Sequence, residues 1–529
     1  MNAPKSLLIG LAFFASIPLF SQKNYWQQQL RYTIDAELHD TEKVISGFET
    51  IVYKNNSPNT LDFIWFHLWA NAYKNESTAL MTQIRGDSLR SGKAAVFSPG
   101  FVEGLDFQVN GKPAQTQPHA NPQYIDIVKV VLPSALLPGD SVVITTPFKV
   151  HLPPYFSRSG YAEGEFIACQ WYPKPAVLDQ LGWHEFPYLD MGEFYSEYAD
   201  YAVSLTVPST FVVGATGTLL TQQEVDIYKS IGAKNVASGK KAPTLYTSPF
   251  NTPTKTLSYF AKQVPDFAWF ADKNFIIQYD TVKLPSGKVV DAFSFYYNKK
   301  KTHWVNSINY IKDAVHHYSA WIGEYEYPTV QAVEGPKNNS SGGMEYPMIT
   351  LVSTADEKAE SLDVTITHEV GHNWFMSMLG SNERDHTWMD EGLNTFFQFR
   401  YEAEKYRSNS FFGNSIPSNV KRLPTDQFLT VVYEAIYKGL PTESAMDTPA
   451  SQFPDTREYG LVSYIKAALW MHILEGAVGT EKTQRAIQLY FQQWKNKHPQ
   501  PADMQAAFEQ GTGEKLNDFF TLTHKKGKF

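Results

Sequence analysis

Hydrophobic and polar positions follow two different rhythms along the chain. From Tyr25 to about Phe260, apolar and β-branched residues form short alternating runs, separated by turn-forming residues such as those at 55–58 and 138–140. After about Asn274 the apolar spacing becomes helical, over residues 303–318, 361–379, 391–404, 463–474 and 480–495. The pattern predicts a multidomain α+β protein, with an antiparallel β domain over residues 22–272 and a mostly helical domain over residues 273–529.

The first residues have the plan of a secretory signal peptide. Lys5 precedes an apolar run over residues 7–20, which ends at Ser21 and Gln22. The run is shorter than the roughly 20 residues that a membrane-spanning helix needs. We therefore expect residues 1–21 to be a cleavable signal and the protein to be periplasmic or secreted, with an uncleaved anchor as the alternative. Cys169 is the only cysteine, so no disulfide forms within the chain, as suits an exported bacterial enzyme.

Composition narrows the classes of function. Of 529 residues, 43% are hydrophobic and 19% are charged, which provides for buried cores and excludes a disordered chain. The net charge is −8, and basic residues cluster only at the last few positions, so we expect no nucleic-acid partner. The 12 Trp, 30 Tyr and 35 Phe suit β surfaces or an aromatic-lined site, and core packing accounts for most of them.

The strongest chemical signal is the sequence His-Glu-Val-Gly-His at residues 368–372. Histidines at positions i and i+4 of a helix lie on one face, where both imidazoles reach the same ion, and Glu369 lies beside them to take a proton from water. The alternative is a pair of buried structural histidines. A catalytic zinc needs three protein ligands and one open position. Because Cys169 is the only cysteine, the third ligand is expected to be a carboxylate: Glu391, with Glu383, Asp385 and Asp390 as rivals. Of these rivals, Glu383 and Asp385 lie in the connecting loop and are expected to be solvated.

These residues resemble a known family. His368 and His372 followed after 18 residues by Glu391 is similar to the zinc signature of gluzincin aminopeptidases of the aminopeptidase N and leukotriene hydrolase type. Three further segments resemble that family's substrate-site motifs, and the likeness covers most of the chain. They are Gly342-Gly343-Met344-Glu345, Tyr464-Ile465-Lys466 and the Gln170 segment.

The resemblance implies a thermolysin-like catalytic domain with one Zn2+ per chain, bound by His368, His372 and Glu391. It implies that Glu369 is the general base and that Tyr464 donates a hydrogen bond to the oxyanion. It further implies that Glu345 binds the free α-amine of a peptide, which makes the enzyme an aminopeptidase. The other substrate-binding residues that it implies are Gly342, Gly343, Met344 and Gln170.

The sequence also departs from the family pattern. Tyr346 replaces the Asn that usually follows the recognition Glu, and Ala467 replaces a Gly. Only residues 465–529 follow Tyr464, so we expect no large C-terminal helical domain, either by design or by truncation, and a site open to longer peptides. The expected partners are peptides with a free N-terminus, without stable membrane insertion after signal cleavage. The alternatives are a zinc endopeptidase, a catalytically silent peptide-binding protein and a carbohydrate-binding module.

Overall fold

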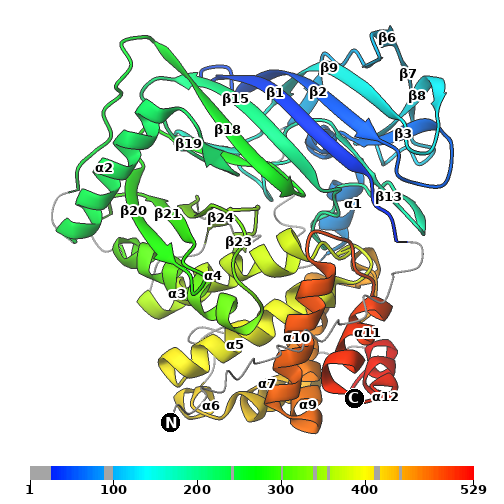
Figure 1. Cartoon of the computed structure of the whole chain (residues 1–529), viewed down its shortest axis with the longest axis vertical. Coiled ribbons are helices and arrows are strands. Elements are labelled where there is room, and N and C mark those ends of the chain that lie inside the picture. The colour runs from blue at the N-terminus through cyan, green and yellow to red at the C-terminus, as the bar shows by residue number, and fades with distance from the viewer. Residues whose placement is uncertain are drawn as a thin grey trace, which may run out of the picture.

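β sheets make up the N-terminal half of the protein and helices most of the C-terminal half (Figure 1). This confirms the predicted α+β class. The computed structural model describes residues 25–87, 99–239, 243–299, 302–336, 342–353, 358–409, 417–439 and 444–529. The predicted signal peptide, residues 1–21, lies outside these ranges.

The largest sheet has nine strands within the described residues. In β1 (Gln29–His39) exposed and buried side chains alternate along the strand, because successive side chains point to opposite faces. The sequence pattern predicted an antiparallel β domain, and this is wrong for one pair of strands: β1 pairs in parallel with β15 (Ala199–Pro208). Strands so far apart in the sequence are joined by a long crossover rather than a hairpin, and such a crossover permits a parallel pair. The other strands are β17 (Thr218–Leu219), β18 (Thr254–Val264), β2 (Val44–Lys54), β9 (Ser141–His151), β5 (Gln108–Val109), β6 (Lys112–Pro113) and β4 (Phe101–Glu103).

Three smaller sheets complete the β half as far as the structure describes it. The first contains β10 (Gly160–Ala162), β11 (Glu165–Ala168), β19 (Trp269–Asp272) and β16 (Val212–Ala215). The second contains β12 (Lys174–Pro175), β3 (Leu61–His67), β8 (Ile127–Leu136) and β7 (Gln115–Pro118). The third is the hairpin of β13 (Val177–Asp179) and β14 (Gly182–His184). The short helices η1 (Trp69–Tyr73) and α1 (Ala79–Gly86) lie between β3 and β4 in the chain.

A helix, α2 (Gln222–Ser238), interrupts the segment that the sequence pattern assigned to strands. Its buried residues recur at helical spacing, but three of the four are Glu224, Gly232 and Asn235, and only Tyr228 is large and apolar. A hydrophobic pattern therefore gave no sign of this helix. In Figure 1 it lies beside β20 and β21.

The helical half also contains a five-stranded sheet that the sequence pattern did not predict. Its strands, in order, are β20 (Ile276–Lys283), β21 (Val289–Tyr296), β22 (Thr329–Glu334), β24 (Ile349–Val352) and β23 (Gly343–Met344). β21 and β22 are parallel, and α3 (Ser307–Trp321) makes the crossover between them. Every side chain of β22 and β24 is buried, so these strands lack the alternation that marks a half-exposed strand.

Helices α4 (Ala359–His372) and α5 (Glu391–Tyr406) pack against each other, and α3 packs on α4 (Figure 1). A π-helical segment, Asn373–Met378, continues α4, and a 3-10 turn, Thr387–Met389, precedes α5. Further helical segments among the described residues are η3 (Trp304–Asn306), α6 (Ser418–Lys421), α7 (Thr425–Gly439), η7 (Ala450–Gln452), α8 (Thr456–Gly460), η8 (Leu461–Lys466), α9 (Ala467–Val478), α10 (Thr480–Trp494), α11 (Pro501–Thr512), α12 (Asn517–Thr521) and η9 (Leu522–His524).

One continuous helical stretch, Thr456–Val478, joins α8 to α9 through the π-helical segment Leu461–Lys466. Among the described residues it is the helix that is long and apolar enough to cross a bilayer, with a mean hydropathy of 1.2 over its best window. However, 61% of that window is buried inside the protein, and the core helix of a globular domain meets the same criteria.

Candidate metal centre and active site

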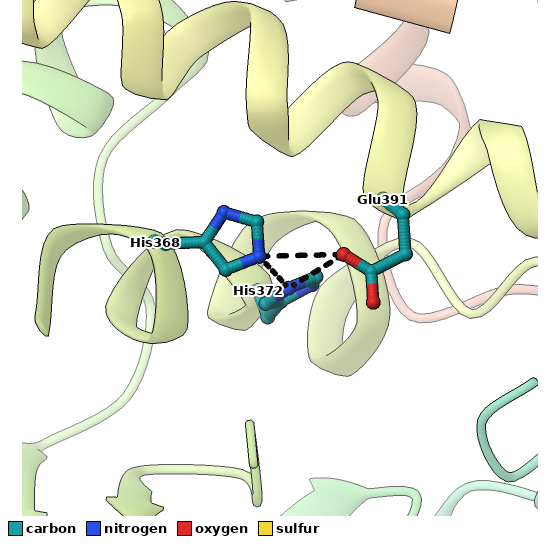
Figure 2. A group of neighbouring side chains, drawn as sticks. All are labelled: His368, His372 and Glu391. Atoms are coloured by element: carbon teal, nitrogen blue, oxygen red, sulfur yellow. Dashed lines mark hydrogen bonds and ion pairs between the residues drawn. The ribbon is translucent and has the colours of Figure 1, made fainter. Parts of the chain in front are cut away.

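The two histidines of α4 and the first residue of α5 meet at one point (Figure 2). The Nε2 atoms of His368 and His372 lie 3.2 Å apart. Each of them lies 3.3 Å from Oε2 of Glu391. All three residues are buried. The helical spacing of the histidines and the packing of α5 on α4 thus bring together the three predicted metal ligands.

Hydrogen bonds at the far side of each ring determine which nitrogen faces this point. Nδ1 of His368 lies 2.8 Å from Oε1 of Gln398, and Nδ1 of His372 lies 2.7 Å from Oδ1 of Asp390. Both oxygens are acceptors, so Nδ1 carries the proton in each ring and Nε2 presents a lone pair. Two imidazole lone pairs and a carboxylate oxygen then face one another, an arrangement that a cation stabilises. The donor set fits Zn2+.

The ionisable groups around this point are strongly perturbed. Burial alone would raise the pKa of Glu391, but the imidazoles of His372 and His368 outweigh it and hold that pKa well below its usual value. Burial raises the pKa of Glu369 to about 7, against the attraction of both histidines. Burial also raises the pKa of Glu345 well above its usual range, and neighbouring carboxylates add to the effect. The site therefore brings buried carboxyl groups close together, and a bound cation would stabilise their ionised forms.

Glu369 follows His368 on α4, and its carboxylate lies against β23. A Cβ atom built on Gly343 would lie 2.2 Å from Oε1 of Glu369, so only glycine permits this contact. The next residue, Met344, is buried, whereas Gly342 is exposed and its carbonyl accepts a hydrogen bond from the Ser353 N–H. The Gly-Gly-Met-Glu segment thus lies beside the predicted general base.

Glu345 comes directly after β23 and is buried beside the metal ligands. One of its carboxylate oxygens belongs to a group of four ligand atoms, with His372, Asp390 and Glu391, that all lie within 4.8 Å of one another. Its Oε1 atom is buried and has no hydrogen-bond partner among the described residues. A buried carboxylate oxygen without a partner is costly, so this position calls for a donor from a ligand.

Tyr464 reaches the metal centre from the π-helical segment Leu461–Lys466. Its hydroxyl donates a hydrogen bond to Oε1 of Glu391, and its ring stacks on His368 with centroids 6.1 Å apart. Lys466, in the same predicted motif, has another role. Its Nζ donates to the carbonyls of Lys525, at 3.0 Å, and Gly527, at 2.7 Å, and so secures residues near the C-terminus.

Gln170 lies just beyond β11 and contacts Tyr346, one of the two residues that depart from the family pattern. Tyr346 donates its hydroxyl to Oε1 of Gln170 at 3.1 Å, so the substitution links the β half to the segment that carries Glu345. The Nε2 of Gln170 is buried, and no described residue is its hydrogen-bond partner. Because this atom is a donor, it suits a carbonyl oxygen of a ligand rather than an ammonium group.

Sequence reasoning missed an ion pair that enters the site from the β half. Arg158 pairs with Oε1 of Glu193, and its Nε donates to Sδ of Met344 at 3.1 Å. Oε2 of Glu193 is buried without a partner within the described ranges, and the charge of Glu193 adds to the raised pKa of Glu345. No motif marks either residue, because each is brought to the site only by the folding of the β half.

The rival metal ligands take other places. Asp390 contacts Nδ1 of His372 and so orients a ligand instead of serving as the third ligand. The sequence did not predict this supporting role for Asp390, nor the similar role of Gln398 beside His368. Glu383 was expected to be solvated, and this is wrong: it is 2% exposed, and its carboxylate lies close enough to Asp390 for each to shift the pKa of the other. Asp385 is half-buried and accepts a hydrogen bond from Asn382 at 2.8 Å.

Comparisons with known proteins agree with this geometry. Residues 307–522 match the model of the Peptidase family M1 domain, and this segment includes the three ligands, Glu369 and Tyr464. The chain is 24% identical over 225 residues to a probable aminopeptidase 2 of Sulfurisphaera tokodaii, which covers 40% of this chain and 27% of that protein. It is 28% identical over 221 residues to a leucine aminopeptidase 2 of Emericella nidulans, covering 40% and 31%. The chain thus aligns with less than a third of the length of these curated relatives.

Solved structures share the fold over nearly the whole chain. A mutant M1 zinc metallopeptidase from Deinococcus radiodurans, bound to a Tyr-Ser-Ala substrate, has a TM-score of 0.62 at 14% identity and covers 96% of both chains. Aminopeptidase A from Legionella pneumophila, in complex with aspartic acid, has a TM-score of 0.63 at 13% identity, over 94% of this chain and 49% of that one.

Proposed function

We propose that this protein, whose residues 307–522 form a Peptidase family M1 domain, is a zinc-dependent aminopeptidase that removes the first residue of peptides. The observation that carries the proposal is the buried carboxylate of Glu345, unpartnered at Oε1 and adjacent to the metal ligands. His368, His372 and Glu391 would hold the zinc. When bound, zinc supplies Lewis-acid chemistry, which lowers the pKa of a water molecule and polarises a carbonyl oxygen.

The position of Glu345 selects the first peptide bond. A ligand oxygen of Glu345 lies within 4.8 Å of ligand atoms of His372 and Glu391. In any peptide the terminal nitrogen and the carbonyl carbon of the same residue are two bonds, or about 2.5 Å, apart. An ammonium group that binds Glu345 therefore brings the carbonyl of the first residue, and no later one, to the metal ligands. Arg158 connects Glu193 to Met344, directly before Glu345, and the Oε2 of Glu193 has no partner among the described residues, so it offers a second acceptor for the same ammonium.

Glu369 moves the proton. Its carboxylate is buried beside the ligands, and burial brings its pKa into the neutral range, which suits a group that must both accept and release a proton near pH 7. Glu369 takes the proton of the attacking water and passes it to the leaving amine. Its packing against Gly343 holds the carboxylate in one place for both transfers.

Tyr464 stabilises the developing negative charge on the carbonyl oxygen. Its hydroxyl lies at Glu391, inside the metal centre, and therefore within reach of a carbonyl that binds there. Burial, with the neighbouring Glu391 carboxylate, raises the pKa of Tyr464 well above its usual value, so the hydroxyl keeps its proton and remains a donor.

Hydrolysis of one peptide in two forms, free and N-acetylated, tests this function. The expected result is that only the free peptide loses its first residue, that a chelator stops the reaction and that added zinc restores it. Internal cleavage of both forms would assign the protein as an endopeptidase and remove the role of Glu345. No cleavage by a protein that holds one zinc would favour the peptide-binding alternative.

Export is part of the proposal and has its own test. The apolar run at residues 7–20 behind Lys5 supports a signal peptide cleaved near Ser21. The protein recovered from a cell's periplasm or medium is expected to lack residues 1–21 by intact mass. Recovery of a mass that includes Met1 would overturn cleavage.

A further inference from the structure

Glu193 belongs to the β half of the protein, but it pairs with Arg158, whose Nε donates to Sδ of Met344 at 3.1 Å, directly before Glu345. It is carried by the connection between β14 and β15, residues 185–198. Arg158 holds one carboxylate oxygen, and the other is buried without a partner in the part of the chain that the structure describes. The orientation of that second oxygen depends on how the connection is docked against the helical half.

Arg384 of the helical half docks this connection. Arg384, between α4 and α5, donates from Nη1 to the carbonyl of Met191 and from Nη2 to the carbonyl of Pro187, both at 3.0 Å. The side chain is 4% exposed. The rigid fork of a guanidinium bonds two carbonyls at once, which the single ammonium of a lysine does not reproduce.

Gly192, directly before Glu193, also packs closely against the helical half. Gly192 has φ of +81°, and a Cβ built on it would lie 2.4 Å from Cβ of Ala450. Ala450 is itself tied to the arginine, since its N–H donates to the carbonyl of Arg384 at 2.8 Å. Glycine at 192 thus permits both the backbone conformation and the approach of the two halves.

From its own side the connection is held by Gln83, whose Oε1 accepts from the N–H groups of Asp190, at 2.8 Å, and Met191, at 3.2 Å. Residues 187–192 are therefore fixed from both halves of the protein. Met191 is held from both sides, two residues before Glu193.

We propose that Arg384 is a positioning residue of the amine subsite: by docking the carbonyls of Pro187 and Met191, it holds the free oxygen of Glu193 where the ammonium group of a peptide binds. The inference rests on the proposed aminopeptidase function. It makes the fit between the two halves of the protein a determinant of substrate affinity. Arg384 touches neither substrate nor metal in this role, and its effect passes through Glu193.

A double-mutant cycle tests this route. Arg384→Met and Glu193→Gln are each expected to raise KM for a free tripeptide about tenfold, the loss of a hydrogen bond to a charged group, with a smaller change in kcat. If Arg384 acts through Glu193, the double variant has a KM within about twofold of either single variant. Multiplication of the two effects, or an unchanged KM in Arg384→Met, would overturn the proposal.

Two further variants separate positioning from folding. Arg384→Lys keeps the charge but not the fork, and should show an intermediate KM with the same lack of additivity. Arg85→Met removes an exposed arginine paired with Glu76 and should leave KM unchanged. Arg384→Met is expected to lower the thermal midpoint equally in both backgrounds, whereas the KM effect disappears when Glu193 is absent.

A measurement of ligand affinity distinguishes failure of this inference from failure of the proposed function. If the wild-type protein removes no residue from free peptides, the aminopeptidase assignment fails. Calorimetry with L-leucinamide on the zinc-loaded protein then runs the same cycle on affinity for a free amine. Non-additive losses of about tenfold would sustain the positioning role, and equal affinity of wild type and Arg384→Met would overturn it.

Discussion

Oδ1 of Asp390 lies 2.7 Å from Nδ1 of His372, so the residue directly before one metal ligand holds the ring of another. Replacing it should therefore weaken zinc binding without removing a ligand. Asp390→Ala is expected to reduce zinc affinity 10- to 100-fold, because His372 loses its orientation and its fixed tautomer. Competition with a chromophoric chelator measures this.

Asp390→Asn is the matched control for that change. It retains a side-chain oxygen that accepts the Nδ1 proton, so its zinc affinity should lie between those of the wild type and Asp390→Ala. Equal zinc affinity of the wild type and Asp390→Ala would show that the contact does not support the ligand.

Glu369→Gln should separate metal binding from proton transfer. The amide keeps the shape of the side chain but accepts no proton, so kcat is expected to fall by 10²- to 10⁴-fold while zinc content stays at one per chain. Steady-state kinetics and metal analysis of the same preparation measure both quantities. A variant that keeps most of its kcat would assign the proton transfer to another group.

Tyr464→Phe removes one hydroxyl and leaves the ring that stacks on His368. The expected loss is 10²- to 10³-fold in kcat with little change in KM, because the hydrogen bond forms with charge that develops during the reaction. Tyr459 lies nearby, with ring centroids 6.0 Å apart, so Tyr459→Phe serves as a control. If Tyr459→Phe shows the larger loss in kcat, that residue is the donor.

The stability of the protein should depend on pH through His498. Its Nδ1 lies 2.7 Å from the carbonyl of Gly380 and its Nε2 2.9 Å from Oε1 of Glu197. Both partners are acceptors, so the buried ring is best satisfied with two protons. Burial lowers the pKa of His498, but Glu197 outweighs it and the net pKa is raised above its ordinary value.

The direction of the pH dependence follows from the linkage between proton binding and folding. A histidine whose pKa is higher in the folded than in the unfolded protein adds stability below about pH 6.5, and this stability is lost as pH rises through the folded pKa. Each unit of difference amounts to about 1.4 kcal/mol. The free energy of unfolding of the wild type should fall more steeply above pH 6.5 than that of the double variant His498→Gln with Glu197→Gln. Parallel pH dependences would contradict this assignment.

The division into a β half and a helical half could be predicted because the spacing of apolar residues along the chain changes from alternating to helical. The metal ligands could be predicted for a similar reason, since a helix places residues 368 and 372 on one face whatever surrounds it. Glu391 followed from its distance along the chain and from the family resemblance. Periodicity failed where burial is complete on both sides, as in β22, or where the buried face is polar, as in α2.

The sequence by itself determined which residues form the proposed metal centre: two histidines, the proposed general base and a third proposed ligand on two neighbouring helices. Only the tertiary structure decided what surrounds it. Glu193 reaches the site because residues 187–192 dock on Arg384, nearly two hundred positions away in the chain. Tyr464 and Lys466 lie two residues apart, but tertiary packing gives them different partners. Tyr464 bonds to Glu391 in the metal centre, whereas Lys466 bonds to the carbonyl of Gly527 near the C-terminus. Contacts between distant segments depend on how whole surfaces pack, and no spacing in the sequence encodes them.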